Sequence, residues 1–288
     1  RRSQRELVEL HAFVQFELDR QLGQAAAAGR RAGLSLGLYQ DLALGSLASG
    51  FDAWRFQDRF VFGVALGAPP DAYAREGQDW GLPPLHPRRI ARGDFEIWRG
   101  LLRAAFAHAG ALRIDHVLGL FRQWWVPAGR PASEGAYVRF PARGMLAVLA
   151  EESRRARALV IGEDLGTVPP QVAPTLARFG VLSSRVLVFE RDRAGRFLPA
   201  RRWSRRALAT ANTHDLPPLP FGAVYRIWIE DSLLRLSAAN SFVPDALLPY
   251  RCRISLPISR ASAWREIGDD TGVPVGDRKS TRLNSSHM

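Results

Sequence analysis

Three short apolar runs of the chain each end in an acidic side chain. The runs are Ala-Leu-Arg-Ile-Asp-His at 111–116, Leu-Val-Ile-Gly-Glu-Asp at 159–164 and Ala-Asn-Thr-His-Asp at 211–215. Their acids, Asp115, Glu163 and Asp215, are about 50 residues apart, the length of one strand–helix–strand unit in a parallel α/β fold. Because the C-terminal ends of parallel strands converge on one site, we expect the three carboxyl groups to lie together.

Carboxyl groups brought together in this way can cleave a glycosidic bond with retention of configuration. One attacks the anomeric carbon, and a second, about 5–5.5 Å away, protonates the departing oxygen. Asp115 suits the attack, because Arg113 lies two residues earlier on the same side of the strand and can keep it ionised. Glu163 must be partly protonated near neutral pH, which apolar surroundings and nearby carboxylates favour. Asp215, beside His214, can bind sugar hydroxyls in the oxocarbenium-like transition state.

The elements that must position these groups alternate between helix and strand. Apolar spacing and end signals predict helices over 3–31, from Asp94 as cap to His108, over 145–157, and from Thr167 as cap through Pro169 and Pro170 to Gly180. We count five strands, at 34–41, 111–116, 159–163, 185–190 and 208–215. Continuous apolar strands alternating with helices predict an α/β fold, a parallel sheet that curls into a (β/α) barrel or is doubly wound.

A long segment, 42–90, separates the first two strands and is rich in Gly, Pro and aromatic residues. Its aromatic side chains argue against disorder, and loops this long inside a compact domain are usually functional. We therefore expect an active-site loop region here.

Composition favours a single cytoplasmic domain. The chain has 288 residues, 47% of them hydrophobic, and one cysteine, Cys252, which fits a reducing compartment. No apolar run has the 18 or more residues of a membrane span, and we expect no membrane partner. The formal net charge is +12, but nearly all of it is scattered arginine, so we expect no nucleic-acid partner either. The only lysine, Lys279, lies in a polar tail, 277–288, that resembles translated vector sequence and is left out of the fold.

Eight strings follow one another along the chain: Gly-Leu-Tyr-Gln-Asp-Leu-Ala (37–43), Gly-Ala-Pro-Pro-Asp (67–71), Gly-Gln-Asp-Trp-Gly-Leu-Pro-Pro (77–84), Ala-Leu-Arg-Ile-Asp-His-Val (111–117), Phe-Arg-Gln-Trp-Trp-Val-Pro-Ala-Gly (121–129), Gly-Ala-Tyr-Val (135–138), Val-Ile-Gly-Glu-Asp-Leu-Gly-Thr-Val-Pro (160–169) and Thr-His-Asp-Leu-Pro (213–217). Together these strings resemble the bacterial 4-α-glucanotransferase (amylomaltase) family of the α-amylase-like barrel enzymes. The resemblance covers about residues 1–219. It implies a (β/α)8 (TIM) barrel.

The resemblance also implies roles for individual residues. Asp115 would be the nucleophile, Glu163 the general acid/base and Asp215 the transition-state stabiliser. The implied substrate-binding residues are Asp41, Trp80, Arg113, His116 and His214. The substrates would be maltooligosaccharides and α-1,4-glucans, with glucose as an acceptor, and neither a metal nor an organic cofactor would be needed. Transfer exceeds hydrolysis only if an acceptor sugar outcompetes water for the glycosyl-enzyme.

The chain departs from the family pattern at both ends. After Leu219 the resemblance stops, so 220–276 stays unassigned, and barrel strands one, two and eight are expected to be missing. We therefore expect 1–219 to form a partial barrel of about five strands. An inactive fragment is the alternative to an active enzyme. Open sheet edges and an exposed interior favour aggregation of such a chain.

Other interpretations stay open. An α-glucan hydrolase of the same superfamily would use the same acids, a metal-dependent barrel enzyme would use them as Mg²⁺ ligands, and a non-catalytic fragment would bind carbohydrate or nucleic acid. Asp164 is adjacent to Glu163 and points the opposite way, which indicates a structural role. His116 and His214 can be core histidines, and Trp124 and Trp125 can be core residues or a wall of the sugar site.

Overall fold

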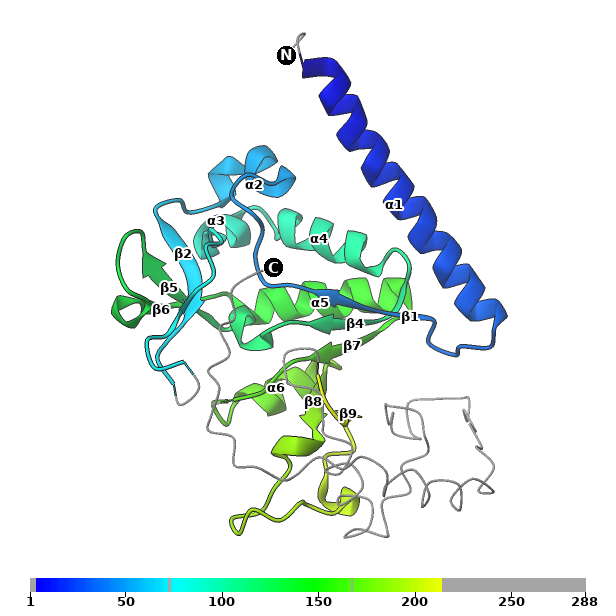
Figure 1. The fold of residues 1–288 in the computed structure, drawn as a ribbon, viewed down its shortest axis with the longest axis vertical. Coiled ribbons are helices and arrows are strands. Elements are labelled where there is room, and N and C mark those ends of the chain that lie inside the picture. Colours follow the sequence, from blue (N-terminus) through cyan, green and yellow to red (C-terminus); the bar gives the residue numbers. More distant parts are fainter. Residues whose placement is uncertain (1–3, 72–73, 167, 214–288) are drawn as a thin grey trace, which may run out of the picture.

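The computed structural model describes residues 4–71, 74–166 and 168–213 (Figure 1). A five-stranded parallel sheet lies at the centre, in the order β1-β4-β7-β8-β9. Its strands are β1 (Leu38–Leu42), β4 (Ala109–Ile114), β7 (Leu159–Gly162), β8 (Leu182–Val186) and β9 (Ala207–Thr210). Each strand pairs with the one before it in the sheet, without the reversal of order that defines a doubly wound fold. The arrangement therefore matches the wall of a barrel.

All five predicted strands are found, with different bounds. The largest shift is in the fourth, which was predicted at 185–190. The chain there leaves the sheet in a 3₁₀ turn, η5 (Leu187–Phe189), directly after β8. The apolar run continues through this turn because Leu187 is itself buried, so periodicity alone could not separate the turn from the strand.

Four helices follow the predicted order: α1 (Arg5–Arg31), α4 (Glu96–Phe106), α5 (Ala142–Ala156) and α6 (Val172–Arg178). The predicted cap at Asp94 is wrong, because α4 begins after Phe95, and both residues have left-handed backbone with no side-chain cap. α6 begins at Val172, beyond the two prolines, with Gln171 at its cap position. Thr167, the predicted cap, lies outside the described residues.

The core lies between the sheet and the pair α4 and α5. Leu102 of α4, Leu112 of β4, and Leu146 and Leu149 of α5 are fully buried there. Burying one leucine side chain contributes about 1.5–3 kcal/mol. These two helices therefore hold β4 in place, which is the strand that carries Arg113 toward the site.

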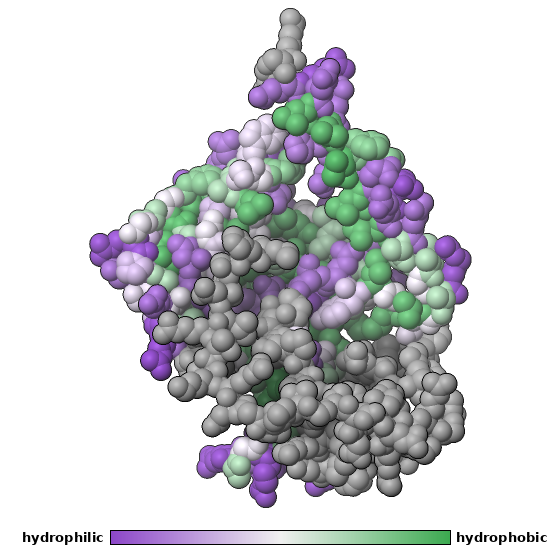
Figure 2. Space-filling model, viewed as in Figure 1, coloured by the Kyte–Doolittle hydropathy of each residue, from purple (hydrophilic) through white to green (hydrophobic). Residues whose placement is uncertain are grey.

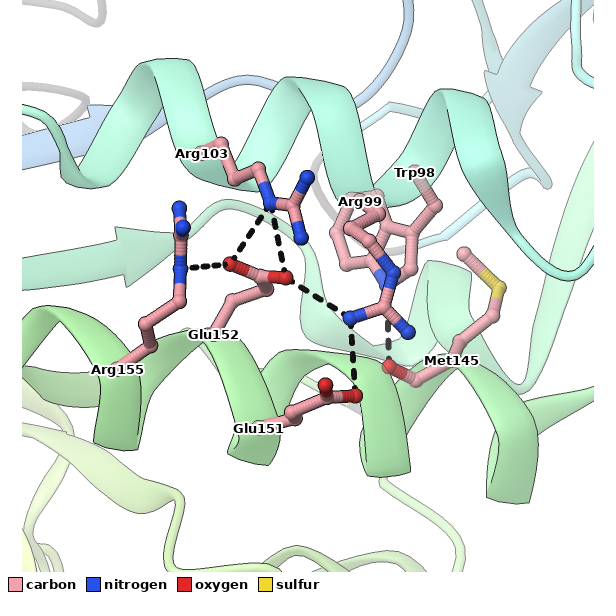
Figure 3. A network of polar contacts seen from close by, with 7 residues as sticks. All are labelled: Trp98, Arg99, Arg103, Met145, Glu151, Glu152 and Arg155. Carbon is pink, nitrogen blue, oxygen red and sulfur yellow. Dashed lines mark hydrogen bonds and ion pairs between the residues drawn. The ribbon is translucent and has the colours of Figure 1, made fainter.

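An ion cluster around the buried Glu152 also joins α4 to α5 (Figure 3). Glu152 of α5 is 1% exposed, and its carboxylate accepts hydrogen bonds from Arg99 (2.8 Å), Arg103 (3.1 Å) and Arg155 (2.8 Å). Arg99 also pairs with Glu151 at 2.9 Å. Burial raises the pKa of Glu152, but the hydrogen bonds from Arg103 and Arg99 outweigh it, so the pKa is lowered. Glu152 therefore stays ionised inside the protein.

A second, antiparallel sheet was not predicted. It has the order β3-β2-β5-β6 and consists of β2 (Val64–Ala68), β3 (Gln78–Asp79), β5 (Arg122–Pro127) and β6 (Ala136–Arg139). The segment 42–90 supplies β2 and β3, together with α2 (Phe51–Arg55), η2 (Gln57–Arg59) and α3 (Pro87–Arg92). The remaining described 3₁₀ turns are η3 (Val117–Leu120), η4 (Ala132–Glu134) and η6 (Ala200–Arg202). Strands of two to six residues interrupted by Gly and Pro give too little alternation to be recognised.

Helix α1 stands away from the sheet and presents an apolar side to solvent (Figures 1 and 2). Of its residues only Ala26 is buried. Its exposed apolar side chains are Leu7, Val8, Leu10, Phe13, Val14, Phe16 and Leu18. Within the described ranges, however, no helix combines the length and apolarity that a membrane crossing requires.

Candidate active site

The register between β1 and β4 places an acid opposite a base. Asp41 pairs with Arg113 across the two strands, and Arg113 Nη1 donates a hydrogen bond to Asp41 Oδ2 at 2.6 Å. The register shifts by one residue at Gly110 of β4, because Leu38 pairs with Ala109 and Tyr39 with Ala111. Sequence reasoning predicted both residues near the site, and the structure brings them into contact.

Arg113 gathers three carboxylates. The nitrogen that binds Asp41 also lies 2.8 Å from Asp115 Oδ1, and Nη2 lies 3.6 Å from Glu163 Oε2. The Arg113 side chain is 12% exposed. Burial lowers its pKa, but the hydrogen bond to Asp41 and the charges of Asp115, Asp41 and Glu163 outweigh this, so the pKa is raised. The predicted contact between Arg113 and Asp115 is therefore present, and the guanidinium stays charged.

Main-chain hydrogen bonds hold Asp115 and Glu163 just beyond the ends of their strands. The N–H of Asp115 donates to the carbonyl of Leu42 at 3.0 Å, and the N–H of Glu163 donates to the carbonyl of Ile114 at 3.0 Å. The N–H of His116 donates to Glu163 Oε2 at 2.7 Å. The carboxyl groups of Asp115 and Glu163 thus meet around one guanidinium at the carboxyl ends of β4 and β7.

The aromatic side of the site comes from the segment 42–90. The Trp80 ring meets the His116 ring edge-on, with centroids 5.7 Å apart, and Trp80 Nε1 donates to Gln78 Oε1 at 2.9 Å. Burial lowers the pKa of His116, and the charge of Asp115 only partly opposes this. His116 is therefore a neutral imidazole near pH 7.

Asp164 lies outside this cluster, as its predicted structural role implies. It is 5% exposed, and its carboxylate accepts hydrogen bonds from the hydroxyl of Ser183 and from the N–H of Ser184, the latter at 2.9 Å. Asp164 thus faces β8, whereas its neighbour Glu163 faces His116 and Arg113.

Trp124 and Trp125 both lie on β5, in the antiparallel sheet. Trp124 Nε1 donates to the carbonyl of Ala132 at 2.9 Å and its ring meets that of Tyr137, while Trp125 packs against Phe140. Their described contacts are thus with this sheet and its neighbours.

Two predicted residues, His214 and Asp215, lie outside the described residues. Sequence reasoning missed Tyr39, which lies two residues before Asp41 and so on the same side of β1. Tyr39 is 48% exposed, and the burial of the rest of the residue raises its pKa to about 12, an effect that the charge of Arg113 opposes and that of Asp41 reinforces. Its hydroxyl is therefore protonated at neutral pH. The same spacing of two that relates Arg113 to Asp115 could have pointed to it. Among the described residues, no group of three His, Cys, Asp or Glu side chains could hold a metal ion.

Comparison with known proteins gives consistent matches. The sequence profile described as 4-alpha-glucanotransferase matches residues 1–235, beyond the limit at Leu219 inferred from the strings alone. The 4-alpha-glucanotransferase of Mycobacterium tuberculosis (strain H37Rv) is 48% identical over 215 residues, which are 73% of this chain and 30% of that protein. The enzyme of that name from Haemophilus influenzae is 41% identical over 214 residues, 74% of this chain and 30% of that protein.

Solved structures agree in fold. Amylomaltase from Corynebacterium glutamicum superposes with a TM-score of 0.70 at 40% sequence identity, over 74% of this chain and 30% of that one. Amylomaltase from Streptococcus agalactiae, solved in complex with acarbose, has a TM-score of 0.68 over 81% of this chain and 50% of that one; at 20% identity it bears on the fold alone.

The chain spans 30% of the length of the M. tuberculosis and H. influenzae relatives. Its parallel sheet is part of a TIM barrel of the α-amylase type. By its sequence match, its fold and the acids at its strand ends, the chain belongs to the 4-alpha-glucanotransferase family.

Proposed function

We propose that the protein transfers α-1,4-glucan segments from one maltodextrin to another, or to glucose, by retaining double displacement through a covalent glycosyl-enzyme. One observation carries the proposal: Arg113 contacts Asp115 and lies beside Glu163, so a nucleophile and an acid/base of the right types meet at adjacent strand ends. The cytoplasm is the proposed location, because a single cysteine in the chain fits a reducing compartment.

In the first step Asp115 attacks the anomeric carbon of the bound glucan. The bond from that carbon to the glycosidic oxygen breaks, its electron pair stays on the oxygen, and Glu163 supplies the proton that this oxygen takes up. Arg113 holds Asp115 through their 2.8 Å ion pair and orients it for the attack. Asp41 on the same guanidinium nitrogen restricts the rotation of Arg113. The products are a glycosyl ester that joins the transferred glucan segment to Asp115, and the released reducing-end fragment of the donor.

In the second step the Glu163 carboxylate removes the proton from the 4-hydroxyl of an acceptor sugar. The acceptor oxygen bonds to the anomeric carbon and Asp115 leaves as a carboxylate, which restores the enzyme. Two inversions give net retention. Trp80 is the proposed wall of the acceptor side, where an indole face can stack on glucose and keep water from the ester. Asp215 and His214 are the proposed partners of the sugar hydroxyls in the transition state.

Incubation of the 288-residue protein with maltotriose tests the proposal. The expected products form a ladder of longer maltodextrins together with glucose and maltose, and the ladder is absent with Asp115→Asn. Asp58→Asn is the matched control, because Asp58 is 71% exposed and pairs only loosely with Arg59, at 3.4 Å. Glucose and maltose without a ladder would indicate the hydrolase instead. A folded protein that gives no products refutes transfer by this chain.

A non-catalytic sugar-binding fragment predicts a different result. Maltotriose binding, measured by calorimetry, would then be present without any turnover, and Asp115→Asn would leave the affinity unchanged. The transferase proposal requires turnover that depends on Asp115, so the two readouts together separate these functions.

A further inference from the structure

His116, directly after the proposed nucleophile, has a left-handed backbone with φ 41° and ψ 59°. Three other non-glycine residues of the described chain have positive φ: Asp94 and Phe95 before α4, and Arg157 after α5. Those three flank α-helices, whereas His116 lies between strand β4 and the short 3₁₀ helix η3. Left-handed backbone is costly for residues other than glycine and often marks functional sites.

The left-handed residue redirects the main-chain donors that follow β4. The N–H of Asp115 still points to the neighbouring strand and binds the carbonyl of Leu42. The next two N–H groups both point to Glu163: that of His116 binds the side-chain Oε2 at 2.7 Å, and that of Val117 binds the main-chain carbonyl at 3.1 Å. Two successive amides therefore fix one residue on the neighbouring strand by its backbone and by its carboxyl group.

We propose that the left-handed backbone of His116 is a positioning device for the acid/base, which orients the Glu163 carboxyl group through the main-chain N–H. The proposal rests on the transferase function above and deepens it, because it makes His116 a positioning residue that acts through its backbone. An N–H donor disfavours a proton on the oxygen that it binds, so the donor also selects which oxygen of Glu163 carries the transferable proton. The imidazole ring has a separate task.

The ring secures the turn. The ring lies edge-on to the indole of Trp80. The main-chain N–H of Trp80 donates to the carbonyl of Leu66 on β2 at 2.9 Å. The segment 42–90 thus packs on the residue that orients Glu163. The proposed acceptor wall and the acid/base are connected through His116, although they lie on different sheets of the fold.

Four variants separate the backbone from the ring. His116→Gly and His116→Asn remove the ring but tolerate left-handed backbone, whereas His116→Ala and His116→Val remove it and disfavour that backbone, the β-branched valine most. Arg157→Val is the matched control, since Arg157 has φ 54° at the end of α5, on another element. It carries the same backbone penalty without touching Glu163.

The first measurement is hydrogen exchange of the amides at positions 116 and 117, which needs no activity. Protection is expected in the parent protein and in the Gly and Asn variants, and is expected to be lost in His116→Val. Glu163→Ala removes the acceptor of the amide at 116 and is expected to deprotect it while 117 stays protected. Equal protection of 116 in the parent and Glu163→Ala overturns the proposal, as does equal protection in the Gly and Val variants.

The second measurement compares two donors, maltotriose and α-maltosyl fluoride, in the first turnover. Fluoride leaves without protonation, so its release does not need the acid. The ratio of fluoride release to maltotriose cleavage is expected to rise about 100-fold in His116→Val, the size of a typical general-acid contribution. It is expected to stay within about threefold of the parent in the Gly, Asn and Arg157→Val proteins, even where loss of the ring lowers both rates.

Each measurement tests the proposal separately. A ratio that rises equally in all four His116 variants shows that the ring is what matters and overturns the proposal. So does a ratio that stays constant in His116→Val. If the parent protein cleaves neither donor, the transferase function fails, and the exchange data alone still decide whether His116 holds the Glu163 carboxyl group.

Discussion

Replacing Glu152 by glutamine should destabilise the protein far more than the same change at Glu151, one residue earlier. Both glutamates contact Arg99 between α4 and α5, at 2.8 and 2.9 Å (Figure 3). They differ in exposure: the side chain of Glu152 is 1% exposed and that of Glu151 is 57% exposed. Glutamine keeps the shape of the side chain but removes its charge, so the pair of variants isolates what burial adds to one ionic interaction.

The magnitude follows from the partners. Arg99 is 20% exposed, and its hydrogen bond to Glu152 counts as charge-assisted, worth about 1.5–3 kcal/mol. Arg103 and Arg155 are 49% and 61% exposed, so solvent screens them and together they add about 1 kcal/mol. Glu152→Gln should therefore cost about 2.5–4 kcal/mol of unfolding free energy. Glu151→Gln should cost no more than about 0.5 kcal/mol.

Urea denaturation followed by far-UV circular dichroism measures both free energies. The slope m should be the same in the parent and the two variants, with the midpoint lowered only for Glu152→Gln. Thermal unfolding should show a decrease in Tm of about 5–15 °C for that variant. Equal midpoints for the two variants would refute the reasoning, because they would show that burial of Glu152 does not strengthen its ion pairs.

Three further predictions follow from pKa shifts and close contacts. The pKa of Glu152 is lowered in the folded protein, so its contribution to the free energy of unfolding is present above the ordinary value of 4.5 and is lost as pH falls through the lower folded value. The difference in unfolding free energy between the parent and Glu152→Gln, measured by urea denaturation at decreasing pH, should therefore become smaller. The pKa of His116 is lowered from 6.5 in the folded protein, so the unfolded chain binds a proton that the folded protein does not. Between pH 7 and 5 the urea midpoint of the parent should therefore fall more than that of His116→Asn. Gly110→Ala would place its Cβ 1.4 Å from the carbonyl oxygen of Leu36, so it should lower the free energy of unfolding by at least about 3 kcal/mol or abolish folding. Gly100→Ala on α4 has no atom within 4 Å of the added Cβ and should raise that free energy by about 0.5–1 kcal/mol in the same assay.

The contacts of the site that lie within one strand could be predicted from the sequence. Arg113 and Asp115 share a side of β4 because side chains alternate, and this alternation needs no tertiary information. The grouping of Asp115 with Glu163 followed from the rule that parallel strands end at a common edge. Both expectations match the described geometry.

Contacts that depend on register or on an unusual backbone could not be predicted. Asp41 faces Arg113 only because the register of β1 against β4 shifts by one residue at Gly110. A glycine inside a strand signals a bulge but does not give the register that results. The left-handed conformation of His116 could not be assigned either, because histidine is enriched at positive φ but most histidines do not adopt it. The antiparallel sheet escaped prediction because β3 has two residues and is recognisable only through its partner β2.

The contacts of Arg113 with Asp41, Asp115 and Glu163 also determine when the site can form during folding. Its carboxylate partners come from three strands, with Asp41 and Arg113 separated by 72 positions in the sequence. Contacts between residues so distant form late, because closing the intervening loop costs entropy before any contact compensates. Until β1, β4 and β7 are side by side, the acids are dispersed along the chain and each is hydrated separately. The proposed glucan binding should therefore be detected only with the last cooperative phase of refolding, and sugar binding would then report the kinetics of strand assembly.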